Sequence, residues 1–131
     1  MRWRTALAAA EVRVLIAGRG DRAVGLACVA AGWLQGLFVV PDAWGSGLAD
    51  RLHDAALMVV QAQGCSRCRL WVLEANHRAR RFYARHSWLP DERRQPASFP
   101  PYPVELRYAL DLDAFTPGGS THLPVTADPP T

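Results

Sequence analysis

The stretch VVPDAWGSGLADRL, residues 39–52, decides the fold, because an apolar strand runs into Pro41 and two glycines then precede a helix. The first turn of a helix presents unpaired backbone N–H groups and the positive end of the helix dipole. Because they lack side chains, Gly45 and Gly47 would let a bulky anion such as a pyrophosphate approach these groups. Two glycines also suit a tight turn between a strand and a helix, so their spacing alone leaves both interpretations open.

Runs of β-branched and apolar residues predict five strands around this stretch. They cover residues 12–17, 24–30, 34–40, 67–73 and 104–112. The segment GRGDR joins the first two strands as a hairpin. In the third strand, alternation assigns one face to Leu34, Gly36, Phe38 and Val40, and the other to Gln35, Leu37 and Val39.

Helical periodicity predicts two helices. Between residues 44 and 63 apolar side chains recur at spacings of four, three and four, and Gly64 supplies a stop. Asn76 fits the N-cap of the second helix, whose inner side is formed by Ala79, Phe82, Tyr83 and His86. Residues 90–103 hold five prolines and are expected to be irregular. This order predicts an α+β fold (mixed α/β), with a mixed, mostly antiparallel sheet flanked by helices.

Composition excludes several classes of protein. Half of the 131 residues are apolar, which is enough for one hydrophobic core. The net charge of +3 comes from fifteen arginines and no lysine, and only RARR at 78–81 is dense. A solvated helix face explains that run better than a nucleic-acid-binding stripe, so we expect no nucleic-acid partner. No apolar run reaches the roughly 18 to 20 residues of a membrane helix, so no membrane partner is expected.

Three cysteines, and a start without a leader-like apolar run, predict a reduced, cytoplasmic protein. Cys65 and Cys68 form a C-x-x-C, which in other settings binds zinc or carries redox chemistry. There is no second pair, and His77 and His86 lack the usual ligand spacing. We therefore expect ordinary turn and core positions for both cysteines, and no metal.

A second segment, EANHRARRFYARHSW at 74–88, together with the glycine stretch resembles the GNAT superfamily of acyl-CoA-dependent N-acetyltransferases. The family's acyl-CoA signature is Arg or Gln, two residues, Gly, one residue, then Gly or Ala. It falls on Trp44, Gly47 and Ala49, so its first position departs. The family's pattern Asn-x-x-Ala-x-x-Phe-Tyr-x-x-x-Gly-Phe is met by Asn76, Ala79, Phe82, Tyr83 and Trp88, with Ser87 where glycine is usual. The resemblance runs from about residue 12 to about residue 112.

The resemblance implies acetyl-CoA as co-substrate and indicates the residues that would hold it. The backbone of Leu37, Phe38 and Val39 would pair with the pantetheine arm, where this strand splays from its neighbour. The pyrophosphate would be held by the amides of Gly45, Ser46, Gly47, Leu48, Ala49 and Asp50. Asn76 would hydrogen-bond the pantetheine arm, besides capping its helix.

Tyr83 is the expected general acid, because acetyl transfer expels a thiolate and a phenol can protonate it. The alternative is that Tyr83 only packs against the sheet. In ribosomal-protein alanine acetyltransferases a glutamate lies five residues before the Asn, and Trp71 occupies that position here, which disfavours this substrate class. Candidate bases are Glu74 at the exit of its strand and Glu105 on the outward face of the last strand. His53 on the first helix, or a water, are further options.

Residues 1–113 are expected to form a single GNAT-like domain that lacks the family's usual first strand and helix, since RWRTALAAAE could supply only the end of one helix. A missing strand exposes a sheet edge, which makes a homodimer a reasonable expectation. Residues 114–131 are mostly Pro, Gly, Thr, Ala and Asp, which predicts a disordered tail. Within the loop at 90–103, Phe99 and Tyr102 would either contact the acceptor or cover the core.

Two functions follow. The first is an N-acetyltransferase that moves an acetyl group from acetyl-CoA to a primary amine of a small molecule or peptide. The second is a catalytically degenerate acyl-CoA-binding or interaction module, which Trp44 and Ser87 would permit. A binding module needs the glycine loop but not the acid, so Tyr83 separates the two hypotheses.

Overall fold

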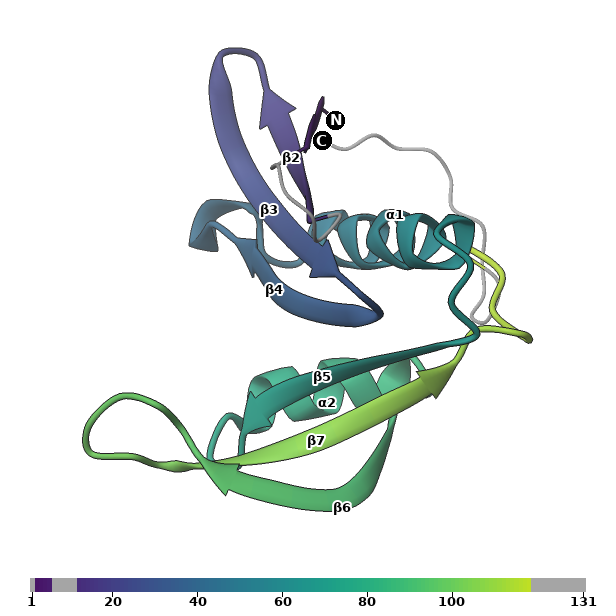
Figure 1. The fold of residues 1–131 in the computed structure, drawn as a ribbon. Coiled ribbons are helices and arrows are strands. Elements are labelled where there is room, and N and C mark those ends of the chain that lie inside the picture. The colour runs from purple at the N-terminus through teal and green to yellow at the C-terminus, as the bar shows by residue number, and fades with distance from the viewer. Residues whose placement is uncertain (1, 6–11, 119–131) are drawn as a thin grey trace.

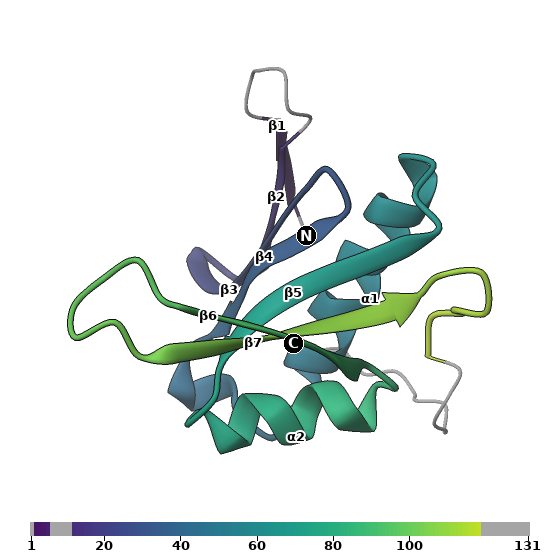
Figure 2. The same ribbon diagram turned by 60° about the horizontal axis from the view of Figure 1, so that its bottom comes forward.

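A computed structural model describes residues 2–5 and 12–118 of the chain. The strands are β1 (Arg2–Thr5), β2 (Arg13–Arg19), β3 (Arg22–Ala30), β4 (Trp33–Val39), β5 (Arg67–Leu73), β6 (Leu89–Pro96) and β7 (Val104–Asp111). The helices are the short 3-10 helix η1 (Pro41–Ala43), α1 (Leu48–Ala62) and α2 (His77–Arg85). The seven strands form one sheet in the order β1-β2-β3-β4-β5-β7-β6. Figures 1 and 2 show α1 and α2 on the same face of this sheet, which confirms the predicted α+β architecture.

The sheet divides at its single parallel pair. β4 and β5 are paired only through Trp33 and Arg69, while every other neighbouring pair is antiparallel. From that point the two strands diverge (Figure 1). Most of the β5-facing edge of β4 is therefore left without a partner strand in the described part of the chain.

A β-bulge changes the faces of β4. The pairing of β4 with β3 skips one residue, Gln35. An extra residue reverses the alternation of side chains beyond it, so Leu34 and Val39 are both buried whereas Phe38 is 56% exposed. The prediction that Leu34 and Phe38 share a face is wrong, because counting with a period of two cannot detect a bulge.

α1 forms the centre of the core. Its inward residues are Leu48, Leu52, His53, Ala56, Leu57, Val59 and Val60. The helix lies so close to β3 that a Cβ on Gly25 would stand 2.7 Å from a methyl carbon of Leu52. Only glycine allows this approach without a shift of the neighbouring side chain.

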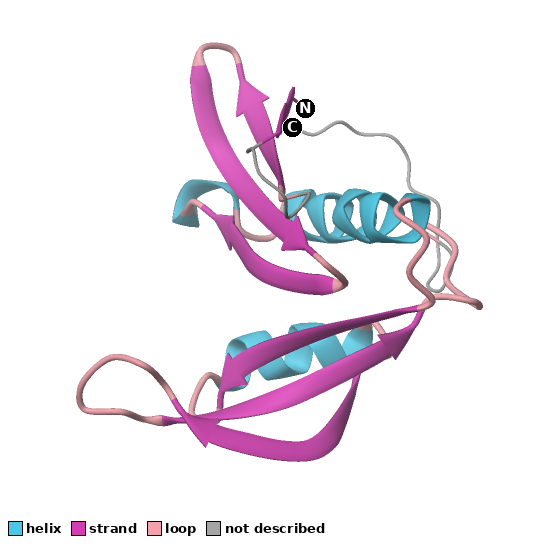
Figure 3. Ribbon diagram, in the orientation of Figure 1, coloured by secondary structure: helices cyan, strands magenta, loops and turns pink. Residues whose placement is uncertain are grey.

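β6 corrects the prediction that residues 90–103 are irregular. Residues 90–96 belong to a strand at the edge of the sheet, paired with β7 alone. An edge strand can contain proline because its outer N–H groups need no partner strand. Residues 97–103 form the loop between β6 and β7 (Figure 3), and its Phe99 and Tyr102 are exposed, so they do not cover the core.

Both ends of the domain also differ from expectation. Arg2–Thr5 is a strand paired with β2, so the prediction that this segment ends a helix is wrong. Because β1 covers the edge of β2, the argument for a homodimer loses its basis, and a dimer stays a prediction. Of the predicted tail, Phe115 packs against the core, Gly118 N–H donates to Asp54 at 2.7 Å, and residues 119–131 lie outside the described part. No helix in the described ranges is long and apolar enough to cross a membrane.

Candidate active site

The glycine loop between η1 and α1 has a conformation that only glycine adopts easily. Gly45 and Gly47 have φ angles of 81° and 86°, in the left-handed region, and Gly47 is the N-cap of α1. A Cβ on either residue would meet no atom within 4 Å. The glycines thus make the tight turn and also leave open space in front of the helix start. The two interpretations of the sequence are compatible.

Four of the six backbone donors predicted for this loop are open. Within the described residues, the N–H groups of Gly45, Gly47, Ala49 and Asp50 make no hydrogen bond. The other two are engaged, since Ser46 N–H donates to the Ala43 carbonyl and Leu48 N–H to Ser46 Oγ, both at 3.3 Å. The loop therefore offers a row of open donors that suits an anion.

Neighbouring side chains compensate the negative charge of Asp50, which lies beside these donors. Its Oδ1 accepts from His86 Nε2 at 2.7 Å and from an Arg85 guanidinium nitrogen at 3.1 Å. The hydrogen bond from His86, with the charge of Arg85, holds the pKa of Asp50 below its ordinary value. These contacts also fasten the start of α1 to the end of α2.

The open edge of β4 presents backbone groups from two of the three predicted residues. Val40 N–H donates to Val24 of β3 at 3.0 Å. Because backbone groups alternate between the two edges of a strand, the groups of Leu37 and Val39 point to the open edge and those of Phe38 toward β3. The Val39 carbonyl accepts from the indole N–H of Trp44 at 2.8 Å. The N–H of Val39 remains open.

α2 and its N-cap carry two of the predicted residues. Asn76 is the N-cap, as predicted, because its side-chain oxygen accepts from Ala79 N–H at 3.1 Å. This bond leaves the amide nitrogen of Asn76 available. Tyr83 packs against Trp88, with ring centroids 5.7 Å apart, and is part of the same core cluster as Cys68 of β5. Burial raises the pKa of Tyr83 to about 12, and it raises the pKa of the neighbouring Cys68 thiol to about 12 as well.

The two candidate carboxylate bases lie near the end of β5 and the start of β7. Glu74 Oε2 accepts from Arg94 at 3.0 Å, and Glu105 Oε1 accepts from Gln95 at 3.0 Å. Glu105 is on the face opposite Tyr108, whose hydroxyl accepts from Arg80 of α2 at 3.2 Å. Glu105 and the helix that carries Tyr83 are therefore on opposite faces of the sheet.

His53 is excluded as a base by its contacts. It is 1% exposed, and its Nε2 accepts from the indole N–H of Trp88 at 2.9 Å. Since an indole can only donate, the Nδ1 of neutral His53 carries the proton and donates to Asp54 at 2.9 Å. Burial lowers the pKa of His53, which favours this neutral form. Sequence reasoning missed this network, since no pattern links residues 35 positions apart.

The same network bears on metal binding. Donor atoms of His53, Asp54 and His86 lie within 4.8 Å of one another. Both ring nitrogens of His53 are already engaged, so a metal would have to displace Trp88 or Asp54. The expected absence of a metal stays a prediction, which a zinc determination on purified protein would test.

Two tryptophans lie on the helix-free face of the sheet. Trp33 of β4 and Trp71 of β5 stack with ring centroids 6.2 Å apart and an interplanar angle of 10°. They lie near the single pair that joins the diverging strands. Trp71 therefore places an aromatic ring where the family resemblance noted a glutamate in other members.

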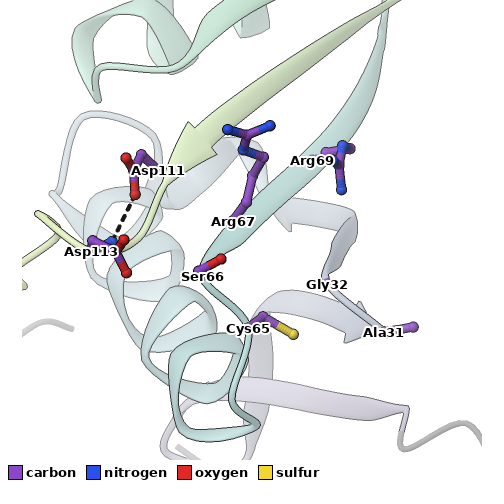
Figure 4. Close-up of a pocket in the computed structure, with 8 residues that line it drawn as sticks. All are labelled: Ala31, Gly32, Cys65, Ser66, Arg67, Arg69, Asp111 and Asp113. Atoms are coloured by element: carbon purple, nitrogen blue, oxygen red, sulfur yellow. Dashed lines mark hydrogen bonds between the residues drawn. The ribbon is translucent and has the colours of Figure 1, made fainter.

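A separate cavity of about 370 Å³ lies at the opposite end of β4 from the glycine loop. It is lined by Ala31, Gly32, Cys65, Ser66, Arg67, Arg69, Asp111 and Asp113 (Figure 4). Cys65 lines this cavity and Cys68 is buried in the core, the ordinary turn and core positions expected for the C-x-x-C. The cavity contains none of the predicted site residues.

Comparison with known proteins identifies the family. The sequence profile of the Acetyltransferase (GNAT) family matches residues 2–88. The chain belongs to the GNAT acetyltransferase family. A search of curated proteins finds no match.

Solved structures of GNAT proteins share this fold. A GNAT-family acetyltransferase from Desulfovibrio desulfuricans is 22% identical, with a TM-score of 0.66 over 77% of this chain and 69% of that chain. A GCN5-related N-acetyltransferase from Rhodopseudomonas palustris is 21% identical, with a TM-score of 0.69 over 77% and 62%. Spermidine N-acetyltransferase from Vibrio cholerae, in complex with CoA and spermine, is 16% identical, with a TM-score of 0.66 over 78% and 66%. The GNAT chain described here thus spans roughly two thirds of the length of these proteins.

Proposed function

We propose that this GNAT protein transfers an acetyl group from acetyl-CoA to a primary amine of a small molecule or peptide, by direct attack of the amine. The divergence of β4 from β5 carries the proposal, because it leaves a strand edge unpaired beside a loop of open N–H groups. A ligand with amides along its middle and phosphates at one end matches both features.

The residues that hold acetyl-CoA follow from the open groups. Leu37 and Val39 would pair with the amides of the pantetheine arm as a strand pairs with its neighbour. The N–H groups of Gly45, Gly47, Ala49 and Asp50 would bind the pyrophosphate. The amide nitrogen of Asn76 would donate to the arm while its oxygen continues to cap α2.

Tyr83 would act on the leaving group. Acetyl-CoA supplies a thioester, whose acyl carbon is open to attack by a neutral amine. The hydroxyl of Tyr83 stays protonated at neutral pH, since its pKa is raised to about 12. It would therefore donate its proton to the sulfur of CoA as the bond between that sulfur and the acyl carbon breaks.

The proton of the attacking amine needs a base on the acceptor side. Glu105 is the stronger candidate, since its face of the sheet is opposite α2 and its partner Gln95 carries no charge. Glu74 is paired with Arg94 at 3.0 Å, so that guanidinium would have to move before Glu74 Oε2 could take a proton. We propose Glu105, directly or through a water, with Glu74 as the second candidate.

One comparison guides the choice of acceptor, and the cysteines bear on the compartment. A neighbouring structure, spermidine N-acetyltransferase, contains CoA and spermine, so polyamines belong in the first acceptor panel. Peptide N-termini and amino-group antibiotics complete that panel. The three cysteines are unpaired, in agreement with the cytoplasmic location that we propose.

The test combines binding and turnover. Acetyl-CoA at 100 times its dissociation constant adds about 2.7 kcal/mol of stability, which should raise the unfolding midpoint by roughly 6 to 12 °C. Gly47→Glu should abolish this shift, because it places a carboxylate against the phosphates. Gly20→Glu is the matched control, since Gly20 also has a positive φ of 61° and open space at its Cβ, but lies in the β2–β3 turn.

A free-thiol release assay across the amine panel then separates the two hypotheses. Release of CoA that depends on an amine and on Tyr83 supports the transferase. A thermal shift without turnover on any amine would favour the degenerate acyl-CoA-binding module. No shift at millimolar acetyl-CoA would contradict both.

A further inference from the structure

The departure at Trp44 is accompanied by an unusual contact. The guanidinium carbon of Arg78 lies 4.0 Å from the centroid of the Trp44 ring. The indole is held in place by the hydrogen bond from its N–H to the Val39 carbonyl, and it remains 52% exposed. Trp44 is thus a fixed aromatic platform on which the cation of Arg78 rests.

The position of Arg78 is not explained by the stability of its own helix. Arg78 lies in the first turn of α2, where the helix dipole disfavours a cation, and that turn contains no acidic residue. Among the described residues no carboxylate lies within ion-pair distance of its guanidinium. The nearby acid of the loop, Asp50, is paired with Arg85 and His86 instead.

The location of the pair suggests what the cation binds. Trp44 directly precedes Gly45, the first residue of the loop with open N–H groups. The guanidinium of Arg78, stacked on the Trp44 ring, therefore lies near the start of the glycine loop, although Arg78 itself belongs to α2. A guanidinium has five donors in a planar fork that fits phosphate oxygens.

We propose that Arg78, positioned by Trp44, binds the pyrophosphate of acetyl-CoA and supplies the cation that the first motif position lacks. This inference rests on the proposed function, because it assigns one more residue to the same cofactor. It makes Trp44 a positioning residue and not a defect of the motif.

Isothermal titration calorimetry of acetyl-CoA tests the assignment without any turnover. Arg78→Ala should weaken binding about 10-fold, which corresponds to about 1.4 kcal/mol, because it removes a charge-assisted hydrogen bond to the phosphates. Arg81→Ala is the matched control, because it removes an exposed arginine from the same helix, and it should change affinity less than twofold. Thermal unfolding without ligand should be the same for both variants.

A transplanted arginine sharpens the test. The double variant Trp44→Arg with Arg78→Ala should recover most of the lost affinity, because it returns a guanidinium to the loop from the motif position. Dephospho-CoA, which lacks the 3′-phosphate, should show the same 10-fold loss with Arg78→Ala. A loss seen with CoA but not with dephospho-CoA would assign Arg78 to the 3′-phosphate and overturn the proposal.

A failure of the Arg78 assignment can be distinguished from a failure of the proposed function. If wild-type protein binds acetyl-CoA and Arg78→Ala binds it equally well, the role of Arg78 is refuted while the proposed function stands. If wild-type protein does not bind acetyl-CoA at millimolar concentration, both are refuted.

Discussion

The two helices differ in what holds them to the sheet. α1 buries seven residues in the core, whereas α2 buries none completely. α2 is held largely by polar contacts at its middle and its end, from Arg80 on Tyr108 and from Arg85 on Asp50. The first contact reaches β7, and the second reaches the first turn of α1, directly after the glycine loop. The comparison teaches that α1 stabilises the fold, while α2 mainly arranges the site.

The largest expected effect comes from truncating a buried side chain at the centre of α1. Leu52 is fully buried against Gly25, so Leu52→Ala should lower the free energy of unfolding by about 2 to 5 kcal/mol. Urea unfolding at neutral pH measures the loss. Met58→Ala, on the exposed side of the same helix, should cost less than about 1 kcal/mol. Equal losses for the two variants would contradict the assignment of the core to one face of α1.

On α2 the expected effect is on turnover. Tyr83→Phe keeps the ring and its contact with Trp88, so the free energy of unfolding at neutral pH should change little. Turnover should fall by about 10²-fold, at the low end for loss of a general acid, with acetyl-CoA affinity retained. Free-thiol release measures the rate. Unchanged turnover would show that Tyr83 only packs.

The pH dependence of stability sharpens the same point. The pKa of Tyr83 is raised from 10.0 in a model peptide to about 12, so the folded protein holds this proton more tightly than the unfolded chain. Stability is therefore unaffected by this group below pH 10 and falls as the pH rises from 10 toward 12, by about 2 to 3 kcal/mol in total. Tyr83→Phe should lose less stability than wild type over this interval, in urea unfolding followed by circular dichroism. Parallel curves would indicate an accessible hydroxyl.

The smallest effect should come from the turn after α2. Ser87 has a φ of 75°, which glycine adopts at lower cost, and Trp88 N–H donates to the Tyr83 carbonyl at 3.0 Å across this turn. Ser87→Gly should therefore raise the free energy of unfolding by about 0.5 to 1 kcal/mol. Thermal unfolding detects such a gain, and Ser46→Gly, in the glycine loop, should not reproduce it. A loss of stability would mean that the serine side chain contributes more than the backbone strain costs.

Sequence reasoning found the elements whose signals are local. The strand at 67–73, the helix ending before Gly64 and the N-cap at Asn76 each depend on neighbours within a few residues, and the structure has them. β6 was missed because its prolines are tolerated only at a sheet edge, and edge position is a property of the whole topology. β1 was missed because four residues carry too little periodicity.

For the site, the motifs indicated backbone groups better than side-chain contacts. Glycines at 45 and 47 predict an open loop because their conformation follows from residue type. No pattern predicts that the Val39 carbonyl accepts from Trp44, or that Arg78 stacks on that ring. Such contacts depend on how α1 and α2 lie together, which sequence spacing does not encode.

The bulge at Gln35 gives β4 two different roles along its length. Before the bulge, the strand is paired on both sides, with β3 and, through Trp33, with β5. Beyond it, the N–H groups of Leu37 and Val39 face a gap and would exchange their hydrogens with solvent rapidly in the free protein. A bound pantetheine arm would slow that exchange, as an added strand does. Hydrogen exchange at Leu37 and Val39 would therefore report whether the open edge of β4 is occupied.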